Sequence, residues 1–97
     1  MSENVLERAI ATYGEKNQVL KCIEEMSELT KALLKLQYAD KQYELQILQD
    51  AVNEEMADVD IMLEQMKMIF RNRNAVENQK IKKLERLKRR LDHEGNR

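Results

Sequence analysis

Apolar residues recur every three or four positions along two long stretches of this 97-residue chain, residues 15–38 and 44–70. Such spacing places one apolar side chain per turn on one face of an α-helix, and no Pro interrupts it. The same pattern, with its breaks, predicts four helices, over residues 3–13, 15–38, 44–70 and 75–92. We therefore expect residues 1–97 to form a single all-α domain, a four-helix bundle in which two long helices supply the core.

The boundaries of these helices follow from residues that favour turns. Gly14 is expected in a left-handed conformation at the end of the first helix, and Ser2 is expected to cap its start. The stretch Tyr38–Tyr43 breaks the apolar stripe, and Arg71–Asn74 contains two Asn, so each predicts a turn. The tail His93–Arg97 is expected to fray.

Charge and cysteine content exclude several classes of protein. The chain has 17 Lys and Arg against 18 Asp and Glu, so its net charge of −1 gives no reason to invoke nucleic acid or a membrane surface. Its one cysteine, Cys22, rules out an intrachain disulfide and suits a reducing compartment. No apolar run approaches the roughly 18 residues of a membrane span, and no secretion signal opens the sequence. We expect a cytoplasmic protein.

The third predicted helix has apolar residues around much of its circumference, including Ile47, Ile61, Met62 and Ile69. A four-helix chain of this size buries little apolar surface for its area, so one subunit has difficulty covering all of them. The sequence therefore predicts a homo-oligomer.

Four carboxylates stand where apolar residues are expected. On a helical wheel at about 100° per residue, Glu55 lies about 20° from Leu48, inside the apolar stripe, and Asp58 follows one turn later. The second helix repeats this arrangement with Glu25 and Glu28. Because positions three apart share a helical face, each helix presents a carboxylate pair towards the core. Antiparallel packing of the two helices would bring both pairs together.

Four partly desolvated carboxylates repel one another, and their pKa values rise. Divalent cations that prefer oxygen ligands, Mg²⁺ or Mn²⁺, resolve this conflict. Iron and zinc are disfavoured because the only histidine is His93 in the tail and Cys22 has no second thiol or imidazole in motif range. An all-oxygen site of this kind most commonly serves phosphate-ester or phosphoanhydride chemistry.

The segments Ile23–Leu29 (IEEMSEL) and Glu54–Leu63 (EEMADVDIML) resemble the EExxE and ExxD halves of the motif of the MazG-like all-α nucleoside triphosphate pyrophosphohydrolases. The wider runs Ala9–Lys35 and Val52–Phe70 look like the small MazG-like proteins of phages and prophages. The resemblance implies a MazG-like bundle, dimeric or tetrameric, with sites walled by more than one subunit. It also implies hydrolysis of a nucleotide between the α- and β-phosphates to monophosphate and pyrophosphate.

Matched by position, the resemblance makes Glu25, Glu28, Glu55 and Asp58 the ligands of Mg²⁺ or Mn²⁺. Glu24 matches the first Glu of the motif and would orient the ligands or the attacking water. All five acidic residues are thus candidate catalytic residues. The cation would clamp the triphosphate while an activated water attacks phosphorus.

Contacts to the rest of the substrate are also implied. Asn17 and Gln18 precede the metal motif by about two turns, where relatives place amides that contact base or sugar, although polar residues at a helix start can equally face solvent. Lys83 and Arg86 resemble the cations that relatives use on phosphates, although a charge run can equally be a solvated face. The expected substrate is a deoxynucleotide such as dUTP or dCTP, or a damaged nucleotide. Because the chain has no Trp, a base would have to stack on another aromatic residue.

Two other functions compete with hydrolysis. Leu84, Leu87 and Leu91 follow coiled-coil spacing, so the chain could be a non-catalytic helical oligomerisation or interaction module. The basic stretch Lys80–Arg90 could instead bind nucleic acid, but Glu85 interrupts it and the neutral total counts against it.

Overall fold

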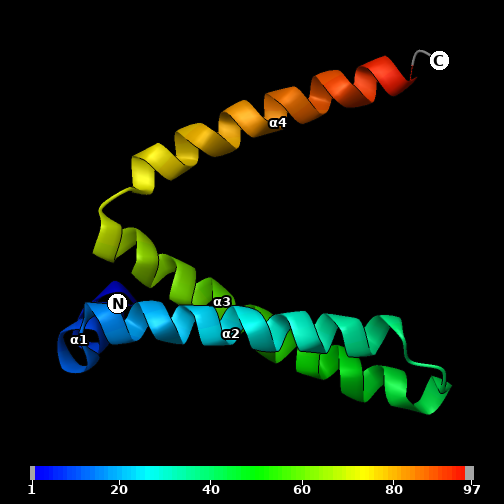
Figure 1. Ribbon diagram of the computed structural model, residues 1–97, viewed down its shortest axis with the longest axis horizontal. Coiled ribbons are helices and arrows are strands. Elements are labelled where there is room, and N and C mark those ends of the chain that lie inside the picture. The colour runs from blue at the N-terminus through cyan, green and yellow to red at the C-terminus, as the bar shows by residue number, and fades with distance from the viewer. Residues whose placement is uncertain (1, 96–97) are drawn as a thin grey trace.

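The computed structural model describes residues 2–95 as helices joined by short turns, and no strand occurs among them. This confirms the all-α class and the presence of two long helices (Figure 1). The elements are α1 (Ser2–Tyr13), α2 (Glu15–Gln37), the short 3₁₀ helix η1 (Gln42–Glu44), α3 (Leu45–Phe70) and α4 (Arg73–Gly95).

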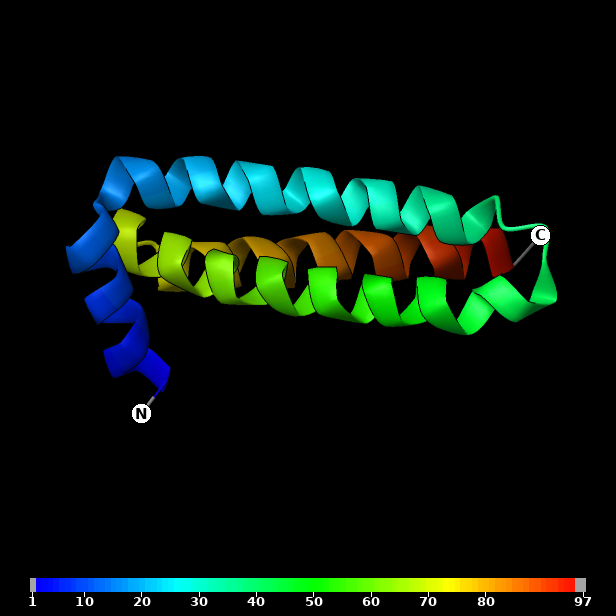
Figure 2. The ribbon, with the colours of Figure 1, turned by 90° about the horizontal axis from the view of Figure 1, so that it is seen from below.

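Helices α2 and α3 form an antiparallel hairpin and lie side by side along most of their length (Figures 1 and 2). Within residues 4–95, the buried apolar side chains are Cys22, Ala32, Val52, Val59 and Met62, all from this pair of helices. Burying a Val or Met side chain contributes about 1.5–3 kcal/mol. The core is therefore a thin seam between two helices, and most of the apolar stripe that predicted the helices stays partly exposed.

Helix α1 crosses the hairpin at the end opposite its tip and contacts both α2 and α3. Gly14 makes the sharp change of direction between α1 and α2, with φ of 91°, and its N–H donates to the carbonyl oxygen of Ile10 at 2.8 Å. Gly14 has the positive φ that was expected, but its ψ of 149° places it in an extended conformation open to glycine and outside the left-handed helical region. Ser2, predicted to cap α1, is instead its first helical residue.

The elbow between α3 and α4 differs from the prediction in detail. The residue with positive φ is Arg71, at 51°, and α4 begins at Arg73, two residues earlier than expected. Glu64 of α3 pairs with both Lys67 at 3.1 Å and Arg73 at 3.0 Å, which ties the first turn of α4 to α3. At the other end, α4 continues through Gly95, so fraying from His93 to Gly95 is wrong; residues 96–97 lie outside the described part of the chain.

Beyond the elbow, α4 diverges from the hairpin, so that the chain has the outline of a V (Figure 1). Every residue of α4 from Glu77 to Gly95 is exposed. The radius of gyration is 17.5 Å, whereas a compact domain of this length is expected near about 12.5 Å. The described helices thus do not close into a four-helix bundle within one chain.

None of the helices in residues 2–95 combines the length and the apolar composition needed to cross a membrane.

Candidate metal centre

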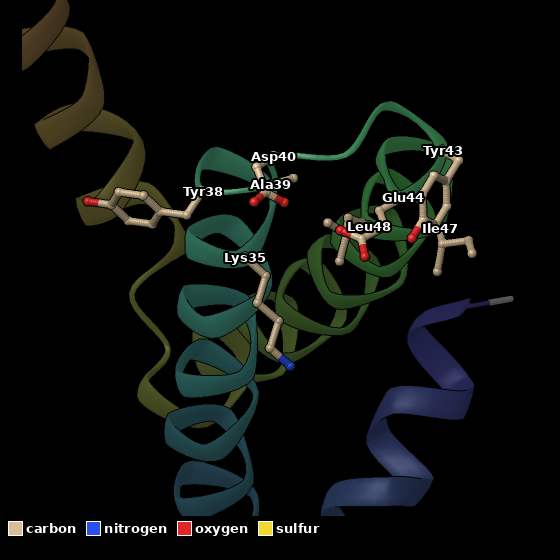
Figure 3. A pocket seen from close by; sticks show the side chains of 8 residues that line it. All are labelled: Lys35, Tyr38, Ala39, Asp40, Tyr43, Glu44, Ile47 and Leu48. Atoms are coloured by element: carbon tan, nitrogen blue, oxygen red, sulfur yellow. The ribbon is translucent and has the colours of Figure 1, made fainter.

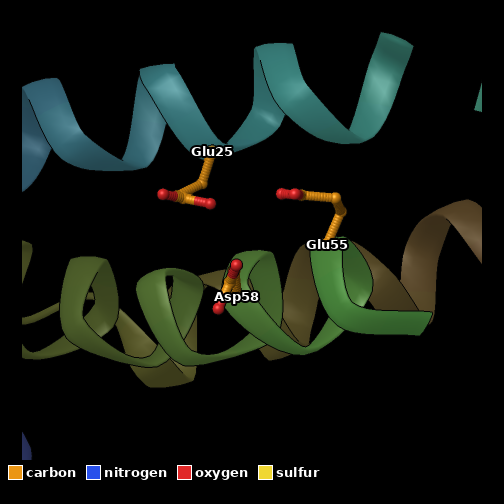
Figure 4. A group of neighbouring side chains, drawn as sticks. All are labelled: Glu25, Glu55 and Asp58. Carbon is orange, nitrogen blue, oxygen red and sulfur yellow. The ribbon is translucent and has the colours of Figure 1, made fainter. Parts of the chain in front are cut away.

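Glu25 of α2 and Glu55 and Asp58 of α3 converge in the middle of the hairpin (Figure 4). One carboxylate oxygen from each residue lies within 4.8 Å of the corresponding oxygens of the other two. Glu55 and Asp58 stand one turn apart on the same face of α3, and the antiparallel pairing sets Glu25 opposite them. The structure therefore brings together three of the four carboxylates that the sequence predicted.

Glu28, the fourth predicted ligand, lies one turn after Glu25 but is outside this group. Its Oε1 pairs with Lys31 Nζ at 3.5 Å on the exposed side of α2. Glu28 is still close enough for its charge to raise the pKa of Glu55.

The three converging carboxylates are partly withdrawn from water. The side chain of Glu25 is 12% exposed, and Oε2 of Glu55 is buried with no hydrogen-bond partner among the described residues. Desolvation raises the pKa of Glu55, and the negative charges of Glu25 and Asp58 raise it further. Desolvation and then Glu25 likewise raise the pKa of Asp58, which stands at the exposed edge of the cluster. The folded chain thus holds carboxylates where an ionised oxygen is unfavourable.

Lys21 is the basic residue that sequence reasoning missed at this site. Its Nζ lies 3.2 Å from Oε1 of Glu25, and that contact, followed by the charge of Glu24, raises the pKa of Lys21. The spacing of four residues between Lys21 and Glu25 on one helix is a signal that could have identified the pair. One ammonium cannot neutralise three carboxylates, and it leaves Oε2 of Glu55 without a partner.

These observations fit a hard divalent cation. The donors are all oxygens, one of them is buried without a partner, and Lys21, Glu25, Asp58, Ile61 and Met62 line a small hollow of about 80 Å³ beside them. Mg²⁺ and Mn²⁺ bind such carboxylates, and their charge would offset the repulsion that desolvation strengthens. The three residues of the cluster could hold the ion directly, with Glu28 as a further ligand.

A second, wider hollow of about 640 Å³ opens at the tip of the hairpin (Figure 3). Lys35 and Leu48 at its wall each lie seven residues, or about 10.5 Å of helix, from Glu28 and Glu55. Positions seven apart share a helical face, so the hollow continues the carboxylate side of the hairpin. Its lining is mainly aliphatic and aromatic: Lys35, Tyr38, Ala39, Asp40, Tyr43, Glu44, Ile47 and Leu48.

The predicted base- and sugar-binding amides lie on the other side of the cluster, beside α1. Asn17 is exposed and donates from Nδ2 to the carbonyl oxygen of Tyr13 at 2.8 Å. Gln18 is 7% exposed, and its Nε2 donates to Oε1 of the buried Gln65 at 2.7 Å. This pair joins α2 to α3 across 47 positions of sequence. Gln18 thus has a structural partner, whereas Asn17 presents an accessible side chain.

The remaining predicted residues stand apart from the cluster. Glu24 is exposed on α2 beside Lys21. Lys83 and Arg86 are exposed on α4, the helix that diverges from the hairpin, so one chain does not bring them to the carboxylates.

A scan against protein-family models, a search of curated proteins and a search of solved structures each find no match to this chain. The MazG-like resemblance therefore rests on the sequence alone, on the motif segments Ile23–Leu29 and Glu54–Leu63 and the wider runs around them.

Proposed function

We propose that this protein is a nucleoside triphosphate pyrophosphohydrolase dependent on Mg²⁺ or Mn²⁺, which cleaves its substrate between the α- and β-phosphates. One observation carries the proposal: Glu25, Glu55 and Asp58 from two helices converge within 4.8 Å, with Oε2 of Glu55 buried and unpartnered. A cation bound to these oxygens would relieve the repulsion between like charges held at this separation. Triphosphate hydrolysis is the chemistry that the paired motif segments imply for such a site.

In this proposal Glu25, Glu55 and Asp58 would hold the cation, and Glu28 would be a further ligand in place of its pairing with Lys31. The bound cation supplies charge neutralisation at the phosphate oxygens. Lys21 keeps Glu25 oriented through its 3.2 Å contact. Asp58, at the exposed edge, marks the side from which the phosphates approach. Glu24, one residue before Glu25, is exposed outside the cluster, and its role in orienting the attacking water rests on the motif alone.

The substrate class is a deoxynucleoside triphosphate. Asn17 on one side of the carboxylates and the hollow at the hairpin tip on the other are the two places that offer contacts to the base or sugar. Lys83 and Arg86 can reach the phosphates only if α4 docks on a hairpin, which makes a dimer or tetramer part of the proposal. The buried free thiol of Cys22 agrees with a reducing cytoplasm as the site of action.

The test is pyrophosphate release over a panel of canonical and modified nucleoside triphosphates, with Mg²⁺, with Mn²⁺ and with EDTA. We expect equimolar monophosphate and pyrophosphate from at least one deoxynucleotide, only when the cation is present. Glu25→Gln should abolish turnover, whereas Asp60→Asn, which removes the same charge from an exposed part of α3, should keep it. Folded protein that hydrolyses none of the panel would contradict the proposal.

A non-catalytic helical interaction module is the second candidate, because α4 exposes an apolar seam. Leu84 and Leu91 are 61% and 56% exposed on a helix that has no packing partner beyond the elbow among the described residues. For such a module, Glu55→Gln should leave complex formation unchanged and Leu84→Asp should abolish it. Cation-dependent turnover would reject this candidate as the sole function.

A further inference from the structure

Lys21 is the one basic residue of α2 that contacts the three converging carboxylates. It lies one turn before Glu25, about 40° from it on a helical wheel, and its Nζ is 3.2 Å from Oε1 of Glu25. The other basic residues of α2, Lys16, Lys31 and Lys35, lie about 180°, 120° and 80° from Glu25. Lys21 therefore shares the face of α2 on which the candidate metal centre is built.

The ion pair with Glu25 leaves part of the Lys21 ammonium free. An ammonium group has three N–H donors, and Glu25 is the carboxylate with which Lys21 pairs within the described residues. The side chain of Lys21 is 50% exposed, whereas that of Glu25 is 12% exposed. Lys21 thus keeps donors and accessible surface for a second anion, while Glu25 is largely enclosed.

Lys21 and Asp58 lie at the same open edge of the cluster. Because α2 and α3 are antiparallel, residues before Glu25 lie beside residues after Glu55, and Lys21 and Asp58 both line the small hollow of about 80 Å³. Desolvation and then Glu25 raise the pKa of Asp58, whereas the charge of Lys21 lowers it. The ammonium therefore acts on both carboxylates at the edge from which a ligand reaches the cluster.

The charge of the cluster gives this ammonium a task beyond pairing with Glu25. Three ionised carboxylates and one divalent cation leave one negative charge, which Lys21 cancels and Glu28 would restore. Without Lys21, a loaded cluster would repel an anionic triphosphate. Lys83 and Arg86 are on α4, which diverges from the hairpin, so within the described chain Lys21 is the cation in place.

We infer that Lys21 is a substrate-binding residue, whose ammonium holds Glu25 through one N–H and donates the others to phosphate oxygens of the nucleotide. Such charge-assisted hydrogen bonds are among the stronger ones in proteins. The inference rests on the proposed function, because it takes the carboxylate cluster as the place where the triphosphate binds. It gives each chain a phosphate contact that does not depend on where α4 docks.

The test is calorimetric titration of the full-length protein with inorganic pyrophosphate, added as its Mn²⁺ complex in saturating Mn²⁺. Lys21→Met removes the charge and keeps most of the side-chain length. Its Kd for pyrophosphate should rise about 10–100-fold, the factor that corresponds to a hydrogen bond with a charged partner. Lys21→Arg should recover most of the affinity. Lys16→Met, exposed on the opposite face of α2, is the matched control and should bind as wild type does.

A separate titration with Mn²⁺ alone distinguishes phosphate binding from orientation of Glu25. For a phosphate contact, Lys21→Met should bind Mn²⁺ at least as tightly as wild type, because a neighbouring positive charge has been removed. If Lys21 only orients Glu25, Lys21→Met should bind Mn²⁺ more weakly and, once saturated, bind pyrophosphate as wild type does. Equal pyrophosphate affinities at saturating Mn²⁺ would overturn the inference.

Two results with wild type separate this inference from the proposed function. Folded wild type that binds Mn²⁺ but not pyrophosphate would overturn the inference and leave the metal centre standing. Folded wild type that binds no Mn²⁺ would overturn the proposed function together with the inference. Circular dichroism verifies the fold of each variant, and Lys21→Gln makes the same comparison if Lys21→Met does not fold.

Discussion

Replacing Glu55 by Gln separates a metal ligand from a structural carboxylate, because the two roles predict opposite changes in stability. The change keeps the size of the side chain and removes one charge from the cluster. In the absence of metal, the pKa of Glu55 is raised by desolvation and by Glu25 and Asp58, so ionised Glu55 destabilises the fold. Metal-free Glu55→Gln should therefore melt at the same temperature as wild type or higher.

With metal present, the order should reverse. At a Mn²⁺ concentration 100 times Kd, binding stabilises wild type by about 2.7 kcal/mol, which for a domain of this length raises Tm by about 10–20 °C. Even partners outside the ligand set change metal affinity by about 10–100-fold. If loss of a ligand weakens binding about 100-fold, the same Mn²⁺ stabilises Glu55→Gln by about 0.4 kcal/mol, or about 2–3 °C.

Differential scanning fluorimetry in EDTA and across a Mn²⁺ series measures both quantities. Asp60→Asn is the control for charge on α3 and should show the wild-type rise with Mn²⁺. A metal-free melting temperature of Glu55→Gln well below that of wild type would show that Glu55 is a structural partner. Equal rises with Mn²⁺ in wild type and Glu55→Gln would refute Glu55 as a ligand.

The remaining predictions concern pH, the buried amide pair and the first turn. The pKa values of Glu55 and Asp58 are raised in the folded chain, so folding favours the protonated carboxyls. Without metal, their stabilising contribution is therefore present at low pH and is lost as the pH rises through the folded-state pKa values. The Tm advantage of Glu55→Gln in EDTA should therefore grow between about pH 4 and pH 7, and an advantage that shrinks with pH contradicts the shift. Gln65→Leu leaves the amide of Gln18 buried without its partner, so urea unfolding should show that the free energy of unfolding falls by about 1–3 kcal/mol. The double variant Gln18→Leu/Gln65→Leu should recover part of that loss. An unchanged free energy of unfolding in Gln65→Leu would show that the hydrogen bond adds nothing to stability. Gly14→Ala forces a side chain to φ of 91° and ψ of 149°, a region that is essentially restricted to glycine, and should cost about 1–3 kcal/mol in the same assay. An unchanged midpoint would mean that the backbone there relaxes freely.

Much of the candidate site could be predicted because it depends on local periodicity. Glu25, Glu55 and Asp58 interrupt apolar stripes, and the period of the helix fixes which face they share before any tertiary contact is known. Their convergence then needs only an antiparallel hairpin, which the short connection at Tyr38–Tyr43 provides. Glu28 sits near the edge of its stripe, where pairing with Lys31 competes with the cluster.

Features that depend on long-range packing could not be predicted in this way. Gln18 looked like a solvent-facing amide because its partner, Gln65, is 47 residues away. The left-handed residue at the elbow is Arg71, a residue type that carries no signal for positive φ, whereas the sequence pattern predicts the turn from the neighbouring Asn residues. The divergence of α4 depends on the direction set at that elbow, which the periodicity of α4 alone does not determine.

Direct titration of Mn²⁺ tests the metal centre without relying on any substrate. Electron paramagnetic resonance of free Mn²⁺ at neutral pH should show saturable binding by wild type and strongly weakened binding by Glu55→Gln, with Asp60→Asn unaffected. Equal Mn²⁺ binding by wild type and Glu55→Gln, or no saturable binding by folded wild type, would contradict the assignment of Glu25, Glu55 and Asp58 as a metal centre.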